Sequence, residues 1–89
     1  MEVRKHIFFS GRVQGVGFRY RSLYIARTLE LTGWVRNCYD DRVEMEVQGL
    51  EVHIDNLVLQ LKDQRFIQID EIEMENIPLK QEHDFVVFE

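Results

Sequence analysis

The sequence has few of the residues that indicate a disulfide, membrane-spanning or low-complexity protein. Only one of its 89 residues is a cysteine, Cys38, which excludes an intrachain disulfide and a cysteine-based metal site. No stretch approaches the run of about 18 apolar residues that a membrane-spanning helix requires. One proline and five glycines are too few for a collagen-like or disordered chain. We therefore expect a globular domain, and the single cysteine and lack of a signal-like N-terminal run favour a cytoplasmic location.

Net positive charge is also absent. The chain has 11 basic and 16 acidic residues and a net charge of −5, which argues against a general nucleic-acid-binding protein. The charge is unevenly distributed, since residues 1–42 have a net charge of +4 and residues 43–89 a net charge of −9. Seven of the eight basic residues in the first segment are arginine, the side chain suited to bidentate binding of phosphate or carboxylate. A local excess of arginine in an acidic protein suggests one small anion site.

Apolar periodicity predicts a single domain over residues 1–89 with alternating strands and helices. Helices are expected from Phe18 to the Leu31–Gly33 region and over residues 51–63, where apolar residues recur with helical spacing. Strands are expected at residues 5–10, 33–38, 43–48, from Ile67 towards Pro78, and at 85–88. The alternation in the fourth strand slips at Asp70-Glu71, which predicts a bulge or a break there.

The order of these elements defines the expected fold class. Strand, helix, strand, strand, helix, strand is the split βαβ pattern of the α+β ferredoxin-like sandwich. We expect an antiparallel sheet of four to five strands, with both amphipathic helices packed on one face.

Three of the five glycines lie in a seven-residue loop, Gly11-Arg-Val-Gln-Gly-Val-Gly17, between the first strand and the first helix. Such a loop can direct successive backbone N–H groups, together with the positive end of the helix dipole, at an anion. It is neither a Walker A loop, because Gly17 is followed by Phe18, nor a dinucleotide fingerprint, because Tyr20 stands where a third small residue is needed. The plainer alternative is a tight turn that binds nothing.

Arg19 directly follows this loop and lies off the apolar stripe of the helix. Its guanidinium could bind two oxygens of a phosphate that the loop N–H groups also hold. The alternative is a solvated arginine on the helix surface, as we expect for Arg12 and Arg36.

Two segments of the chain resemble a known family. Gly11-Arg-Val-Gln-Gly-Val-Gly-Phe-Arg19, followed by Thr32-Gly-Trp-Val-Arg-Asn37, closely resembles the two signatures of the acylphosphatase family, and the likeness covers nearly the whole chain. The resemblance implies a ferredoxin-like fold and hydrolysis of the carboxyl–phosphate anhydride of acyl phosphates, without metal or cofactor. It also implies a monomer whose small-molecule partners are an acyl phosphate and inorganic phosphate.

The resemblance assigns roles to particular residues of this sequence. Arg19 is implied to bind the phosphoryl group, and Asn37 to orient the attacking water. The backbone amides of the loop are implied to complete the phosphate site, and they belong to Gln14, Gly15, Val16, Gly17, Phe18 and Arg19. One departure is Asp41, which stands where the family usually has glycine in a turn, although aspartate can adopt the left-handed conformation at modest cost.

Other chemistries fit the sequence less well. His6, His53 and His83 are scattered and form no pair with the spacing of a zinc site, so no metal centre is expected. Cys38 follows Asn37 on a strand and should point to the opposite face. It is interpreted as a packed thiol rather than a nucleophile.

A non-enzymatic binding module is the main alternative. RNA-recognition domains share the strand order, but they need exposed aromatic residues on the third strand, where this chain has Val43-Glu-Met-Glu-Val47. A phosphate-binding accessory domain related to acylphosphatases stays open, because such domains also occur within larger carbamoyl-transfer maturation proteins. Turnover of an acyl phosphate would distinguish an enzyme from a binding domain.

Overall fold

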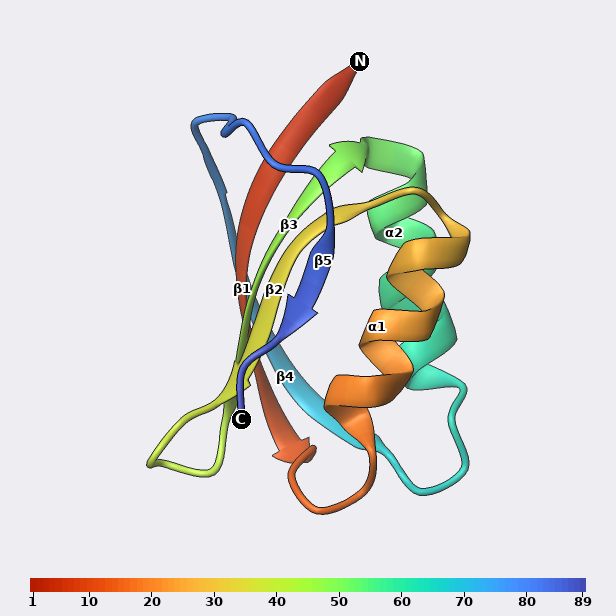
Figure 1. Ribbon diagram of the computed structural model, residues 1–89. Coiled ribbons are helices and arrows are strands. Elements are labelled where there is room, and N and C mark those ends of the chain that lie inside the picture. The colour runs from red at the N-terminus through yellow and green to blue at the C-terminus, as the bar shows by residue number, and fades with distance from the viewer.

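The computed structural model describes residues 1–89 and contains seven regular elements in the predicted order (Figure 1). They are β1 (Glu2–Arg12), α1 (Phe18–Thr28), β2 (Thr32–Asn37), β3 (Val43–Leu50), α2 (Glu51–Lys62), β4 (Gln68–Ile77) and β5 (Phe85–Val87). The first strand begins three residues earlier than the sequence pattern predicts, which places Arg4 within the sheet. Neither helix is long and apolar enough to cross a membrane.

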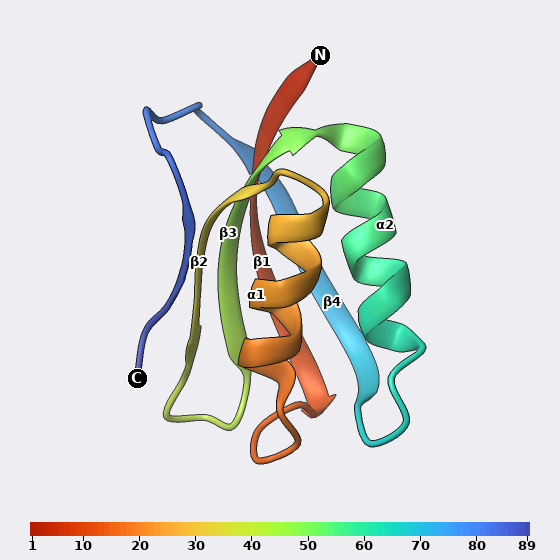
Figure 2. The ribbon, with the colours of Figure 1, turned by 45° about the vertical axis from the view of Figure 1, so that its right-hand side comes forward.

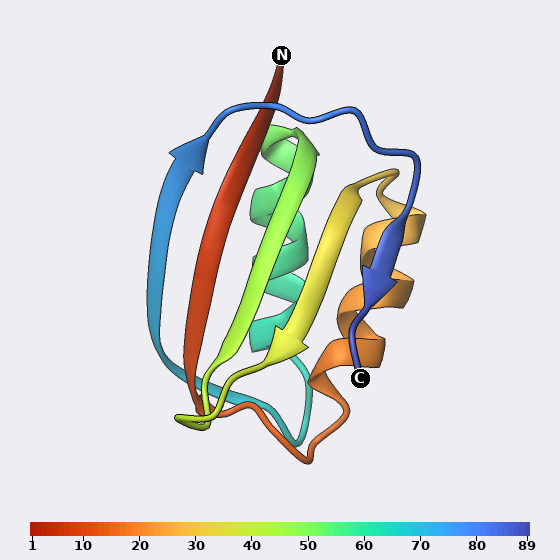
Figure 3. The same ribbon diagram turned by 60° about the vertical axis from the view of Figure 1, so that its left-hand side comes forward.

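The five strands form one sheet in the order β4-β1-β3-β2-β5. The first four pair antiparallel, whereas β5 runs parallel to β2, so the sheet is mixed and not wholly antiparallel as predicted. The cause is the path of residues 78–84, which cross the end of the sheet from β4 to the opposite edge (Figure 3). Because the chain turns back there, β5 runs opposite to β4 and in the same direction as β2.

Both helices cover the same face of the sheet (Figure 2), which confirms the ferredoxin-like α+β fold. The core between the helices and the sheet contains 16 buried apolar residues. Each such Val, Leu, Ile or Phe side chain contributes roughly 1.5–3 kcal/mol when removed from water. The apolar face predicted for the first helix packs as expected, with Phe18, Ser22 and Ala26 buried and Ile25 and Leu29 partly buried.

The first helix ends earlier than predicted. It stops at Thr28, and Glu30 takes the left-handed conformation with φ of 57°. The N–H of Leu31 donates to the carbonyl of Ala26 at 2.8 Å, and the N–H of Glu30 donates to that of Arg27 at 3.1 Å. These are the two bonds of a Schellman motif. The left-handed conformation of Glu30 therefore ends the helix, whereas the sequence pattern predicts its end in the Leu31–Gly33 region.

The fourth strand has the predicted bulge. Ser10 pairs with Glu71 and Gly11 pairs with Ile69, so Asp70 is an extra residue on β4. The bulge restores the phase of the apolar residues that face the helices. Pro78 follows the last residue of β4, as predicted.

A buried arginine fixes the crossing segment to the sheet. Arg4 is 1 % exposed, and its guanidinium donates to both carboxylate oxygens of Glu82, at 2.7 and 3.1 Å. It also binds Glu46 at 2.9 Å through Nε. The side chain of Gln48 exchanges two hydrogen bonds with the backbone of Lys80, at 2.8 and 2.9 Å. These contacts hold residues 78–84 in place and thereby set where β5 and the following residues meet α1.

Candidate active site

The loop between β1 and α1 presents a row of free backbone donors. Gly15 and Gly17 have φ of 73° and 79°, a left-handed conformation that glycine adopts without strain. None of the backbone N–H groups from Gln14 to Tyr20 donates to another atom of the protein. The start of α1 also lacks a capping side chain and an acidic residue in its first turn. This arrangement leaves the partial positive charge of the helix N-terminus available to an anion.

The guanidinium of Arg19, in the first turn of α1, already contacts two oxygen atoms of the protein. Its Nη1 donates to the carbonyl of Phe88 at 2.8 Å and lies 3.5 Å from Oε1 of Glu89. The same carboxylate accepts a hydrogen bond from the hydroxyl of Tyr20, which raises the pKa of Tyr20. The guanidinium thus already binds a carbonyl and a carboxylate, the kinds of oxygen ligand that a phosphoryl group would replace.

Asn37 is the last residue of β2, and its side chain has an unused acceptor. Its Oδ1 is buried and has no hydrogen-bond partner in the protein. A buried amide oxygen without a partner is costly, so this atom is suited to accept a hydrogen bond from a water or a substrate. The adjacent Cys38 is half-buried, and burial raises the pKa of its thiol. The protonated thiol is a poor nucleophile. The predicted placement of Cys38 on the face opposite Asn37 is wrong, because Cys38 follows the end of β2 and lines the same cavity as Asn37.

The fold places Arg19 and Asn37 in one open cavity of about 450 Å³. The helix start and the end of β2 meet there because α1 packs over β2 and β5 (Figure 1). Of the predicted phosphate-binding residues, only Arg19 lines this cavity, and none of residues 14–18 does. The side chain of Phe18 is buried in the core, and Val16 packs against it. The other lining residues of this cavity are Arg36, Cys38, Tyr39, Phe88 and Glu89.

Several of these lining residues were not expected from the sequence. Arg36 was interpreted as a surface charge, but it lines the cavity while it pairs with Glu44 at 2.7 Å. Phe88 also lines the cavity, and its ring packs against Trp34, with 5.7 Å between the ring centroids. No local pattern could connect Phe88 or Glu89 with Arg19, because about seventy residues separate them in the chain.

The structure shows the conformation of Asp41 in the turn that follows Asn37. Asp41 has φ of 71°, the left-handed conformation expected for a position where glycine is usual. The Asp40 side chain supports the turn, since its carboxylate accepts hydrogen bonds from the backbone N–H of Arg42 at 3.3 Å and from Arg42 Nε at 2.8 Å.

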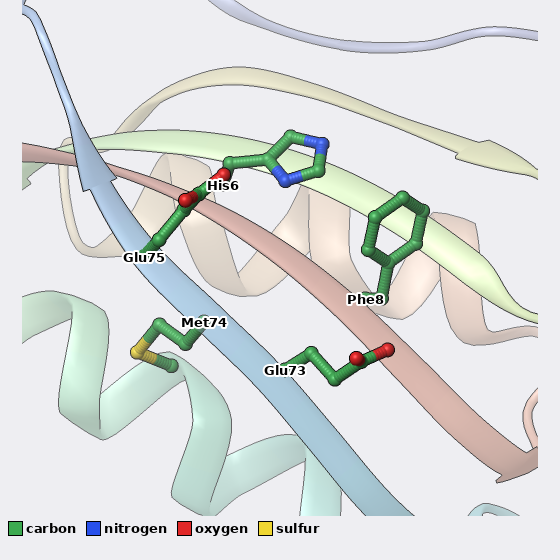
Figure 4. Close-up of a pocket in the computed structure, with 5 residues that line it drawn as sticks. All are labelled: His6, Phe8, Glu73, Met74 and Glu75. Atoms are coloured by element: carbon green, nitrogen blue, oxygen red, sulfur yellow. The ribbon is translucent and has the colours of Figure 1, made fainter.

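A second cavity, of about 270 Å³, lies across β1 and β4 and contains none of the predicted site residues (Figure 4). His6 is engaged there by Glu44, 2.7 Å from Nε2 to the carboxylate. No group of three or more His, Cys, Asp or Glu residues is placed to hold a metal ion. The remaining lining residues are Phe8, Glu73, Met74 and Glu75.

Comparison with known proteins identifies the family. The acylphosphatase family model matches residues 5–87, and a curated acylphosphatase of Bifidobacterium longum is 44 % identical over 81 residues, which are 90 % of this chain and 84 % of that protein. The chain belongs to the acylphosphatase family. Acylphosphatases are hydrolases that act on acyl phosphates. The crystal structure of the acylphosphatase from Bacillus subtilis matches with a TM-score of 0.90 and 34 % identity, over 100 % of both chains.

The acylphosphatase fold also occurs within a larger solved protein. The crystal structure of HypF from T. kodakarensis matches all of this chain with a TM-score of 0.83 and 33 % identity, but the match covers only 12 % of that protein. A domain similar to this chain can therefore be part of a much longer polypeptide.

Proposed function

We propose that the domain of residues 1–89 hydrolyses acyl phosphates without a metal ion, with Arg19 and the loop amides binding the phosphoryl group and Asn37 orienting the attacking water. The observation that supports this proposal most is the placement of Arg19 and Asn37 in the lining of one cavity, together with the lack of a hydrogen-bond partner for the buried Oδ1 of Asn37. The free N–H groups from Gln14 to Tyr20 lie at the same end of α1. Together they supply donors for phosphoryl oxygens and an acceptor for a water.

Hydrolysis of an acyl phosphate requires little covalent catalysis by the protein. In an acyl phosphate the leaving group is a carboxylate, so phosphoryl transfer to water depends mainly on positioning and charge stabilisation. The water oxygen forms a bond to phosphorus while the bond from phosphorus to the acyl oxygen breaks, and the carboxylate leaves with that electron pair. Asn37 is not a general base, because its amide can only donate and accept hydrogen bonds, and the one carboxylate that lines the cavity, Glu89, is paired with Tyr20 and Arg19. The water proton therefore passes to a phosphoryl oxygen of the substrate.

We further propose that the protein acts as a monomer in the cytoplasm and does not bind nucleic acid. The outer strand β4 exposes Glu71, Glu73 and Glu75 on one face, and like charges brought together by edge-to-edge pairing of two copies would repel. The net charge of −5 disfavours polyanionic partners and leaves small phosphates as the fitting ligands.

The test is turnover of acetyl phosphate, with acetate and inorganic phosphate measured in the presence and absence of EDTA. The proposal predicts equal release of both products and no effect of the chelator. The second candidate, a phosphate-binding accessory domain as the match to HypF suggests, predicts phosphate binding without release of acetate. An activity that EDTA removes would contradict the metal-free mechanism.

A further inference from the structure

Gln14 lies in the glycine-rich loop, but its side chain is directed at the hairpin that follows Asn37. Its Nε2 lies 2.9 Å from the carbonyl oxygen of Cys38 and 2.9 Å from that of Arg42. Both neighbours are acceptors, so the side chain must present its NH₂ group to them. Each of the two N–H bonds then has one carbonyl acceptor.

The two carbonyls mark the base of the turn over residues 38–42. The N–H of Cys38 donates to the carbonyl of Arg42 at 2.8 Å, so these residues face each other where the turn begins and ends. From the side of the glycine-rich loop, the side chain of Gln14 donates to both carbonyls at this base. Its two hydrogen bonds are the only ones that join residues 13–17 to residues 37–42.

The same contact connects the two parts of the proposed site. Asn37 directly precedes Cys38 in the chain, and its Oδ1 has no partner that could fix the side chain. The backbone of Asn37 is held by β3 on one side through the pairing with Val43. On the side of the loop, the bonds from Gln14 to the neighbouring Cys38 and to Arg42 provide the connection.

We infer that Gln14 is a positioning residue for hydrolysis, whose side-chain amide holds the base of the 38–42 turn, and with it Asn37, at a fixed distance from the loop N–H groups. This inference rests on the proposed function, because it assigns the bound phosphate to the loop and the water to Asn37. In such a reaction, misplacement of the nucleophile by about 1 Å can cost about 100-fold in rate. Phosphate binding needs only the loop and Arg19, so it does not depend on this alignment.

The test compares Gln14→Met, which keeps the length of the side chain and removes both donors, with the wild type. Acetyl phosphate turnover gives kcat and KM, and a titration with inorganic phosphate gives the affinity of the loop. We expect kcat to fall about 10- to 100-fold while the phosphate affinity changes by less than about threefold. Gln64→Met is the matched control, because Gln64 follows the end of α2 and its Nε2 bonds only to the carbonyl of Gln60 within that helix. The kcat of this control should equal that of the wild type.

A double-mutant cycle with Asn37→Ala separates a positioning role from general destabilisation. If Gln14 acts through Asn37, Gln14→Met should lower kcat by less than about threefold when Asn37 is already alanine. An equal loss in both backgrounds would overturn the inference, as would an unchanged kcat in Gln14→Met or a parallel loss of phosphate affinity.

Gln14→Glu provides a second variant, because its carboxylate would repel the two carbonyls, and wild-type turnover there would also overturn the inference. Failure of the wild type to hydrolyse acetyl phosphate would instead contradict the proposed function.

Discussion

At the scale of single residues, the two side chains of the proposed site differ in whether they already have polar partners in the protein. Arg19 already has oxygen partners, the carbonyl of Phe88 and the carboxylate of Glu89. Asn37 has an acceptor without any partner. A substrate phosphoryl group must therefore replace existing contacts at Arg19, whereas the Oδ1 of Asn37 has no hydrogen bond to give up.

Replacement of Asn37 by alanine should lower turnover of acetyl phosphate about 10²- to 10³-fold, as for the loss of one preorganised electrostatic contact. The binding of inorganic phosphate should be retained, because the loop N–H groups and Arg19 are unchanged. Steady-state kinetics and a phosphate titration on the same preparation measure the two quantities. Normal turnover in the variant would remove Asn37 from the mechanism.

The carboxylate of Glu89 should compete weakly with phosphate for Arg19. It is 70 % exposed and 3.5 Å from the guanidinium, so its pairing is largely screened by solvent. Glu89→Gln should tighten the binding of inorganic phosphate about two- to threefold at low ionic strength, with a smaller gain in high salt. Weaker phosphate binding in this variant would show that Glu89 supports the site.

Sequence alone could identify Arg19, Asn37 and the glycine-rich loop as candidates, because each lies within a contiguous motif. It could not reveal the partners of Arg19, which lie at the other end of the chain. Nor could it show that the side chain of Gln14 reaches the hairpin, 24 and 28 residues away. Contacts of this range depend on how α1, β2 and β5 pack together, which local periodicity does not encode.

At the scale of elements, periodicity predicted the order of all strands and helices and a bulge or a break at Asp70-Glu71, where the structure has a bulge. It misplaced the end of α1, because glycine is the usual residue at the left-handed position and the chain uses Glu30 there instead. It also missed the parallel direction of β5, which follows from the long crossing of residues 78–84. The ends of elements depend on single backbone conformations, and strand direction depends on connections, so neither is visible in an apolar pattern.

The left-handed conformation of Glu30 predicts a stabilising substitution. Glu30→Gly should raise the free energy of unfolding by about 1 kcal/mol, because the β-carbon penalty in this conformation disappears. Urea unfolding measures the change. Asp41→Gly is the matched comparison, since Asp41 also has a positive φ, and it should gain less because aspartate tolerates this conformation better. A less stable Glu30→Gly variant would contradict this account of the helix end.

At the scale of the whole molecule, Arg4 joins the sheet to the segment that carries β5 to its place beside β2. The guanidinium is buried and binds Glu46, Gln48 and Glu82. Arg4→Met should lower the free energy of unfolding by about 3–5 kcal/mol, because it leaves partly buried carboxylates without their cation. A loss below about 1 kcal/mol in urea unfolding would show that these ion pairs behave as surface pairs.

The same cluster predicts the direction of acid sensitivity. The hydrogen bond from Arg4 lowers the pKa of Glu82 below its ordinary value, although partial burial opposes the shift. A lowered pKa in the folded protein stabilises it above the ordinary glutamate pKa of about 4.3, and this contribution is lost as the pH falls through the folded value. Unfolding free energies measured from neutral pH down to about pH 3 should therefore decrease less steeply in Arg4→Met than in the wild type. An equal slope would exclude the Arg4–Glu82 pair as a source of acid sensitivity.

The most direct test of the central claim, a phosphate site formed by Arg19 and the loop N–H groups, is a titration of ¹⁵N-labelled protein with inorganic phosphate followed by NMR. The account predicts that the largest amide shifts fall on residues 14–20, in the wild type and in Asn37→Ala alike. They should disappear in Arg19→Ala and persist in Arg21→Ala, a control at an exposed arginine of the same helix. Shifts centred elsewhere, for example on the cavity around His6 and Glu75, or shifts that survive in Arg19→Ala, would contradict it.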